Sequence, residues 1–127
     1  MRKINIDTIP HDHQRYPTCG DYWEDKDGIE QVRVSYFPDW RMGALVILHE
    51  LIESILCKHR EISEPAITQF DIDYDKVNKA GEPGDDPSAP YYHEHYFSTI
   101  IERMVAAELG VNWNEYGKAI DALFGKE

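Results

Sequence analysis

The sequence predicts an α+β fold: a small N-terminal antiparallel sheet followed by about four helices, the first of which carries a His-Glu-Leu-Ile-Glu motif. Two observations predict this class. Apolar and polar side chains alternate with a period of two in the first forty residues, as in strands. The rest of the chain shows helical spacing between recognisable start and stop signals. The 127 residues fit a single domain, mainly β over residues 1–38 and mainly α over residues 39–127.

Three segments account for the predicted sheet. Isoleucines alternate with polar residues over positions 4–6, which favours a short strand. Residues 29–37 alternate over a longer stretch and follow Asp27-Gly28, a sequence typical of hairpin turns. We therefore expect residues 16–23 to pair with residues 29–37 as an antiparallel hairpin.

The predicted helices are placed by their caps. Asp39 can cap a helix over about residues 40–59, and Ser63 can cap a second helix that reaches residue 77. A loop rich in Gly, Pro and Asp covers residues 78–90. A third helix is expected from about residue 88 to 109, ahead of Gly110. The fourth begins at Asn112 and ends by Gly125.

The net charge of −11 limits the classes of partner. Residues 1–60 carry a net −2 and residues 61–127 a net −9, so the acidity is concentrated in the second half. This balance argues against binding to nucleic acid and to anionic membrane surfaces. No apolar run approaches the roughly 20 residues of a membrane span, and the N-terminus lacks a signal-peptide core. Two cysteines, Cys19 and Cys57, are expected to be free thiols in the cytoplasm.

The motif His49-Glu50-Leu51-Ile52-Glu53 is the strongest candidate for chemistry. On a helix, His49 and Glu53 lie about 40° apart on one face, so that both can reach one cation. Glu50 lies beside them and could act as the general base on a metal-bound water. The fifth position holds glutamate where H-E-x-x-H peptidases have histidine, and glutamate is itself a zinc ligand. The alternative is an ordinary solvent-facing polar stripe.

The third predicted helix offers the remaining ligands. His93-Glu94-His95 stands near its start, and Glu102 lies seven residues after His95 on the same face. We expect His95 to be the third ligand, with His93 as the open alternative. Glu102 would be a fourth ligand or would accept a hydrogen bond from a ligating imidazole, and Glu94 could play either role. The expected cofactor is a divalent metal, in first place zinc.

Three other groups are weaker candidates. His11-Asp12-His13 could supply ligands, although a short His-rich loop usually faces solvent. Asp71, Asp73 and Asp75 alternate but lack the central Gly of an EF-hand loop, so a calcium loop is rejected. Cys57 lies on the same side of its helix as the motif, where a small core residue is the more usual interpretation.

Much of the chain resembles a set of small uncharacterised proteins from phages, prophages and bacteria. This resemblance implies a phage-type origin, which would place the protein in the host cytoplasm, and it implies no particular activity. The matching segments, besides the motif itself, are Ile9-Pro10-His11, Gln14-Arg15-Tyr16, Gly20-Asp21-Tyr22-Trp23, Arg33-Val34-Ser35, Asp39-Trp40-Arg41, Pro83-Gly84-Asp85-Asp86-Pro87 and Ile101-Glu102-Arg103.

A second resemblance concerns layout. A strand that leads through a short turn into a helix with His49 and Glu50 is similar to zincin-type metalloproteases. It implies a hydrolase of peptide or amide bonds, and a substrate that binds as an extra strand at the sheet edge. The alternatives are a metal-binding protein without catalysis and an acidic factor that binds a basic patch on a host protein. The oligomeric state is left open.

Overall fold

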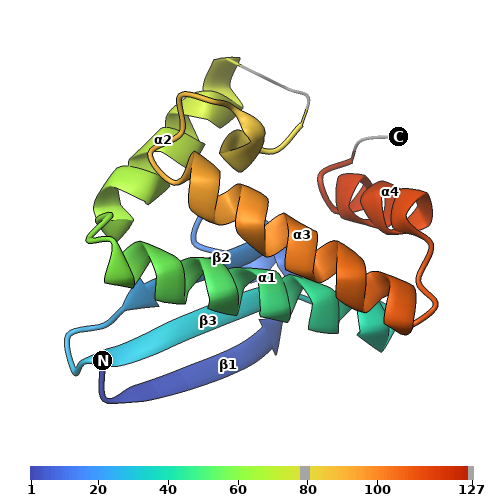
Figure 1. Cartoon of the computed structure of the whole chain (residues 1–127), viewed down its shortest axis with the longest axis horizontal. Coiled ribbons are helices and arrows are strands. Elements are labelled where there is room, and N and C mark those ends of the chain that lie inside the picture. Colours follow the sequence, from blue (N-terminus) through green and yellow to red (C-terminus); the bar gives the residue numbers. More distant parts are fainter. Residues whose placement is uncertain (78–80, 126–127) are drawn as a thin grey trace.

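The computed structural model describes residues 1–77 and 81–125, and these have an α+β architecture (Figure 1). The sheet consists of β1 (Lys3–Ile9), β2 (Gly20–Glu24) and β3 (Ile29–Ser35). Four helices follow in the described residues: α1 (Trp40–His59), α2 (Glu64–Val77), α3 (Tyr92–Glu108) and α4 (Trp113–Leu123). The single-turn 3-10 helices η1 (His11–His13) and η2 (Pro83–Asp85) lie in connections. The predicted fold class is confirmed.

The sheet has the strand order β1-β3-β2. It differs from the predicted antiparallel sheet in the relative direction of one pair of strands. β2 and β3 are antiparallel as predicted, with Tyr22 opposite Val32. β1 runs parallel to β3, from Lys3 opposite Ile29 to Ile9 opposite Ser35. The sheet is therefore mixed and not purely antiparallel. Apolar alternation indicates which face of a strand is buried but carries no information on the direction of its neighbour.

Helix α1 is the central element of the molecule. It packs against β2 and β3 on one side and against α3 on another. Leu45 on α1 is fully buried. The polar residues His49 and Glu53 on the same helix are almost fully buried as well. The alternative interpretation of this polar stripe as a solvent-facing surface is therefore wrong. Helix α3 covers this polar stripe.

The caps of α1 and α4 are those predicted. The Asp39 carboxylate accepts a hydrogen bond from the Arg41 backbone N–H, and Asn112 accepts one from the Glu115 N–H. α3 begins at Tyr92, later than the predicted position near residue 88. Pro90 disfavours helical backbone at the preceding residue, Ala89, so the helix does not begin at residue 88. Of the predicted loop over residues 78–90, positions 78–80 lie outside the described residues, and the rest includes η2.

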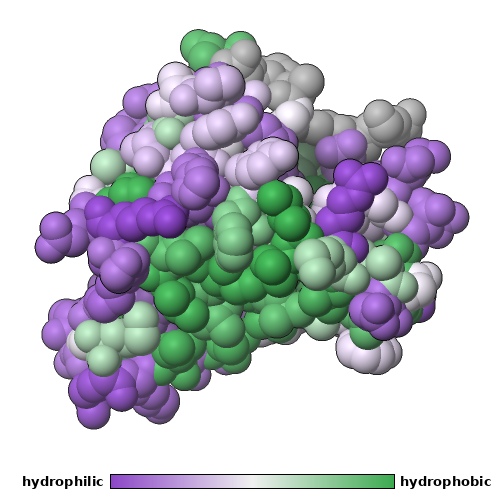
Figure 2. All heavy atoms as spheres, viewed as in Figure 1, coloured by the Kyte–Doolittle hydropathy of each residue, from purple (hydrophilic) through white to green (hydrophobic). Residues whose placement is uncertain are grey.

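Helix α3 is inverted relative to an ordinary surface helix, which turns apolar residues inward and polar residues outward. Its buried residues are Glu94, His95, Ser98, Glu102 and Ala106. Its exposed large hydrophobic residues are Tyr92, Tyr96, Phe97, Ile100 and Met104. Figure 2 shows hydrophobic surface over α1 and α3 on this side of the molecule. The polar face that α3 turns toward α1 therefore needs partners within the protein. None of the described helices is long and apolar enough to span a membrane.

Candidate metal centre

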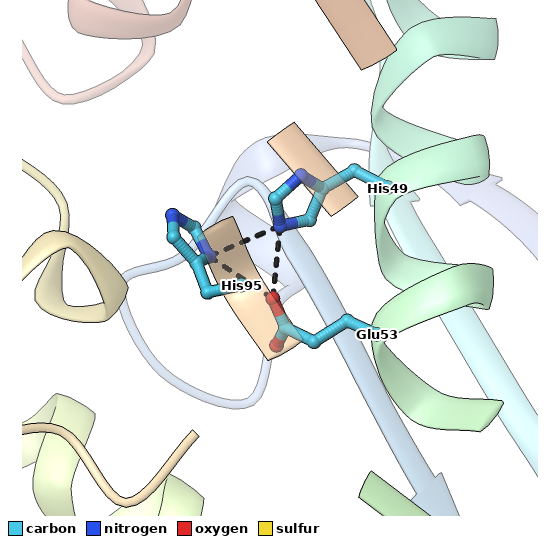
Figure 3. A group of neighbouring side chains, drawn as sticks. All are labelled: His49, Glu53 and His95. Atoms are coloured by element: carbon cyan, nitrogen blue, oxygen red, sulfur yellow. Dashed lines mark hydrogen bonds and ion pairs between the residues drawn. The ribbon is translucent and has the colours of Figure 1, made fainter. Parts of the chain in front are cut away.

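Three side chains from α1 and α3 point toward one another (Figure 3). His49 Nε2 lies 2.9 Å from Glu53 Oε2 and 3.1 Å from His95 Nδ1, and His95 Nδ1 lies 3.0 Å from Glu53 Oε2. All three side chains are buried. We call this group the central cluster. His49 and Glu53 lie on the same face of α1 because they are four residues apart, and His95 faces them from α3.

Groups behind the central cluster hold two of its members in place. Glu102 Oε1 lies 2.7 Å from His49 Nδ1, the ring nitrogen that faces away from the cluster. The other oxygen of Glu102 accepts a hydrogen bond from the Tyr116 hydroxyl. The Tyr22 hydroxyl donates to Glu53 Oε1 at 2.8 Å. The side chains therefore point inward because their outer atoms are engaged elsewhere.

The charges of the central cluster are strongly coupled. Burial alone raises the pKa of Glu53, but hydrogen bonds from His49 and His95 outweigh it and lower that pKa to about 2. Burial alone lowers the pKa of His49, but its bonds with Glu102 and Glu53 hold the pKa well above its usual range. The pKa of His95 is likewise raised, because Asp85, Glu53 and Glu82 outweigh burial. The surroundings of the two imidazoles thus favour positive charge.

The arrangement of the central cluster suits a cation. Two neutral imidazole nitrogens and a carboxylate oxygen all offer lone pairs, so at separations near 3 Å they repel unless protons or a positive ion lie between them. Ligand atoms about 2.0–2.2 Å from a tetrahedral zinc ion lie roughly 3.3–3.5 Å apart, slightly further than the distances seen here. The buried His/Glu group is therefore positioned to hold a metal ion.

Glu50 faces a cavity of about 120 Å³ that the central cluster also lines. Its side chain is partly exposed. Burial and the nearby Glu53 carboxylate raise the pKa of Glu50 well above its usual range. The cavity has room for several water molecules, since one buried water molecule needs roughly 10–15 Å³. Glu50 can therefore meet both solvent and a ligand beside the cluster.

Two glycines allow the backbone to approach the site closely. A Cβ atom on Gly20 of β2 would lie 2.5 Å from Glu50 Cγ and 2.6 Å from Glu50 Oε1. A Cβ atom on Gly84 of η2 would lie 2.4 Å from His95 Cγ. Glycine at these positions gives the carboxylate and the imidazole the space they occupy.

The structure brings together some of the predicted site residues and separates others. His49, Glu53 and His95 meet, with Glu102 behind His49. His93 is exposed on the outer side of α3, away from the central cluster. Glu94 is buried but pairs with Arg60, whose Nη1 lies 2.6 Å from Glu94 Oε2.

The weaker sequence candidates also lie outside the central cluster. Cys57 Sγ is 3.5 Å from the Tyr22 hydroxyl. His11 Nδ1 lies 2.8 Å from Ser35 Oγ, and the exposed His13 lies beside Asp12. Asp71 accepts hydrogen bonds from two tyrosine hydroxyls at the cavity wall.

Several residues of the site have no signal in the helical pattern. Tyr22, Tyr116 and Gly20 reach the site from β2 and α4, and Glu82, Gly84 and Asp85 reach it from the η2 turn. Only the segment Pro83-Gly84-Asp85 is distinctive in the sequence, as part of a Gly/Pro/Asp-rich loop. A loop with closely spaced Gly and Asp next to a ligand-bearing helix is the one signal that points to these residues.

Comparison with protein-family models, with curated proteins and with solved structures finds no match for this chain.

Proposed function

We propose that this protein is a metal-dependent hydrolase of peptide or amide bonds. His49, Glu53 and His95 would hold the metal, in first place zinc, and Glu50 would be the general base. The observation that carries the proposal is the convergence of two imidazole nitrogens and one carboxylate oxygen within about 3 Å of one another. Two histidines and one glutamate form a ligand set found in zinc hydrolases that leave a further position open.

Glu50 has the properties that the role of base demands. A zinc ion, when bound, lowers the pKa of a water molecule and polarises a carbonyl group. Glu50 lines the same cavity, and its raised pKa makes its carboxylate a stronger base toward a water molecule there. Gly20 leaves room for that carboxylate beside the cluster.

The position of β2 supports a peptide as substrate. β2 is an edge strand of the sheet, and its residues Gly20, Asp21 and Tyr22 line the cavity. An extended peptide can pair with such an edge through main-chain hydrogen bonds. A bond bound there would lie next to Glu50 and the central cluster.

The first test is the metal content of protein purified without added metal. We expect at least one equivalent of zinc in the wild type and loss of the ion at the central cluster in His49→Ala and His95→Ala. His93→Ala is the matched control, because His93 is exposed two residues from His95. Circular dichroism checks that each variant is folded. A folded wild type that binds no divalent metal, even when zinc is supplied, contradicts the proposal.

The second test addresses catalysis. A mixture of fluorogenic peptides is incubated with the zinc-loaded wild type and with Glu50→Gln, which keeps the shape of the side chain but removes the base. We expect hydrolysis by the wild type and a loss of at least 100-fold in the variant. The control is Glu108→Gln, a change at an exposed position of α3. Equal rates in all three proteins would refute the role of Glu50.

A non-catalytic metal staple is the second candidate. It is favoured by the fact that the central cluster joins α1 to α3, so that a bound ion would link two helices. Stoichiometric zinc, no hydrolysis of the peptide mixture and a large drop in melting temperature on chelation would select this function.

A further inference from the structure

The second ring nitrogen of His95 has unusual surroundings. Nε2 is fully buried, yet it has no hydrogen-bond partner among residues 1–77 and 81–125. Glu82 Oε2 and Asp85 Oδ1 each lie 3.2 Å from it, close enough for contact. The imidazole as a whole is 6% exposed, and it is aimed at these two carboxylates from inside the protein.

The directions of these contacts distinguish a hydrogen bond from a coordination site. An acceptor of a hydrogen bond lies near the axis of the N–H bond. Glu82 and Asp85 meet the distance for a hydrogen bond to Nε2 but not its full geometry. Ligand atoms that share a metal ion surround that ion, so they lie off the axis along which the nitrogen lone pair points. One nitrogen with two carboxylate oxygens arranged in this way fits a divalent cation.

The charge of the cavity wall also exceeds what one ion neutralises. Four glutamates line the cavity, one of them within the central cluster and three around it: Glu53, and Glu50, Glu82 and Glu102. Asp85 adds a fifth carboxylate at 3.2 Å from His95 Nε2. None of the described residues that line the cavity is Lys or Arg. One divalent ion offsets two of these charges, so the carboxylates around His95 leave negative charge that a second ion can offset.

We propose that Glu82, Asp85 and His95 Nε2 form a second divalent-cation site. The His95 ring then bridges two ions, one at Nε2 and one at Nδ1 in the central cluster. This inference rests on the proposed function, since it shares His95 with that site. Both ring nitrogens coordinate only when the imidazole has lost both N–H protons. Binding of the second ion therefore releases the remaining ring proton to solvent, and the ring becomes an imidazolate.

The test counts metal ions. Metal-free protein is loaded with excess zinc, passed through a desalting column and analysed for zinc per chain. We expect two ions in the wild type and one in the double variant Glu82→Gln/Asp85→Asn. The control Asp27→Asn/Glu108→Gln removes the same two charges from exposed positions and should keep two ions. One ion in both the wild type and the double variant overturns the second site and leaves the first intact, whereas no ion in the wild type overturns both.

Cobalt gives a readout that depends on the bridge. Two Co²⁺ ions joined by an imidazolate couple magnetically, so the paramagnetic resonance signal per cobalt should be weaker in the wild type than in the double variant. Two ions with uncoupled signals, or two ions retained by Glu82→Gln/Asp85→Asn, overturn the proposal. If the double variant loses both ions, coupling in the wild type decides: a coupled pair supports the bridge and an uncoupled pair refutes it.

Discussion

Each ring nitrogen of His49 has a different partner, and this division determines what the side chain can do. Nδ1 faces Glu102 at 2.7 Å, which leaves Nε2 to face Glu53 and His95. A carboxylate behind a coordinating imidazole fixes the ring orientation and raises the basicity of the opposite nitrogen. Tyr116 of α4 in turn donates a hydrogen bond to Glu102, and so helps to fix the orientation of the His49 ring.

The first prediction at the residue scale concerns Glu102→Gln. The amide oxygen of glutamine can still accept from His49 Nδ1, but the negative charge is lost. We expect zinc affinity to fall roughly 10–100-fold, as is typical when such supporting groups are changed. Competition with a chromophoric chelator measures the affinity. Glu108→Gln on the same helix should leave it unchanged, and an equal affinity for all three proteins would show that Glu102 does not tune the ligand.

A second prediction concerns Gly20→Ala. The new Cβ would lie 2.5–2.6 Å from three atoms of the Glu50 side chain, so the carboxylate must move. A misplacement of about 1 Å can cost 100-fold in rate. We therefore expect peptide hydrolysis to fall by about that factor while zinc content is kept. Gly43→Ala on α1 is the matched control, because a Cβ there meets no atom within 4 Å. Full activity of Gly20→Ala would show that the position of the Glu50 carboxylate does not matter for hydrolysis.

At the scale of elements, α1 and α3 are joined by polar groups at two levels. The central cluster lies midway, and the Arg60–Glu94 ion pair lies at the C-terminal end of α1. Glu94 is 6% exposed at its side chain and Arg60 is 42% exposed. A buried carboxylate that loses its cation remains as an unpaired charge, which is costly.

The prediction for this pair is that Arg60→Met destabilises the protein by about 2 kcal/mol, less than for a fully buried pair because Arg60 is partly solvated. Zinc content should not change, since Glu94 lies outside the central cluster. Urea denaturation gives the free energy of unfolding. Lys58→Met removes a solvent-exposed pair with Glu24 and should cost less than about 1 kcal/mol. Loss of zinc from Arg60→Met would place Glu94 in the metal site after all.

The elements that could be predicted from the sequence are those with local signals. Asp39 and Asn112 mark helix starts because a cap is a contact within one turn. The parallel pairing of β1 depends on a strand that is distant in the sequence. The start of α3 at Tyr92 depends on whether the chain before and at Pro90 forms a turn or the first turn of the helix. Neither leaves a periodic trace in the sequence.

The same distinction applies to the candidate site. The i, i+4 spacing is enough to place His49 and Glu53 together, whereas the choice of His95 over His93 depends on the rotation of α3 about its axis. The contributions of Tyr22 and the η2 turn depend on long-range packing. No pattern within a few residues reports such contacts.

At the scale of the whole molecule, Asp71 connects three parts of the chain. It belongs to α2, and its carboxyl oxygens accept hydrogen bonds from Tyr16 in the N-terminal part and from Tyr91 at the start of α3. Burial raises the pKa of Asp71 from 3.8 to about 6, against the opposing effect of the two hydroxyl donors. The folded protein therefore holds a proton here over a pH range in which the unfolded chain has released it.

This difference predicts how stability depends on pH. Between about pH 4 and pH 6 the folded state binds more protons at Asp71 than the unfolded state, so the contribution of this group falls as the pH rises. The stabilisation is complete below pH 4 and is lost as the pH passes through 6. Two pKa units correspond to on the order of 2–3 kcal/mol. The uncharged side chain of Asp71→Asn lacks this dependence.

We expect the free energy of unfolding of Asp71→Asn, relative to the wild type, to increase by about 2 kcal/mol from pH 4 to pH 7. Urea denaturation at half-unit steps of pH measures it, with metal-free protein so that the central cluster does not add a zinc-dependent slope. Asp73→Asn changes an exposed aspartate of the same helix and controls for the loss of one charge. A constant difference between Asp71→Asn and the wild type would mean that the Asp71 carboxyl ionises alike in both states. A difference that shrinks with rising pH would mean that the tyrosine hydroxyls stabilise its charged form more than burial destabilises it.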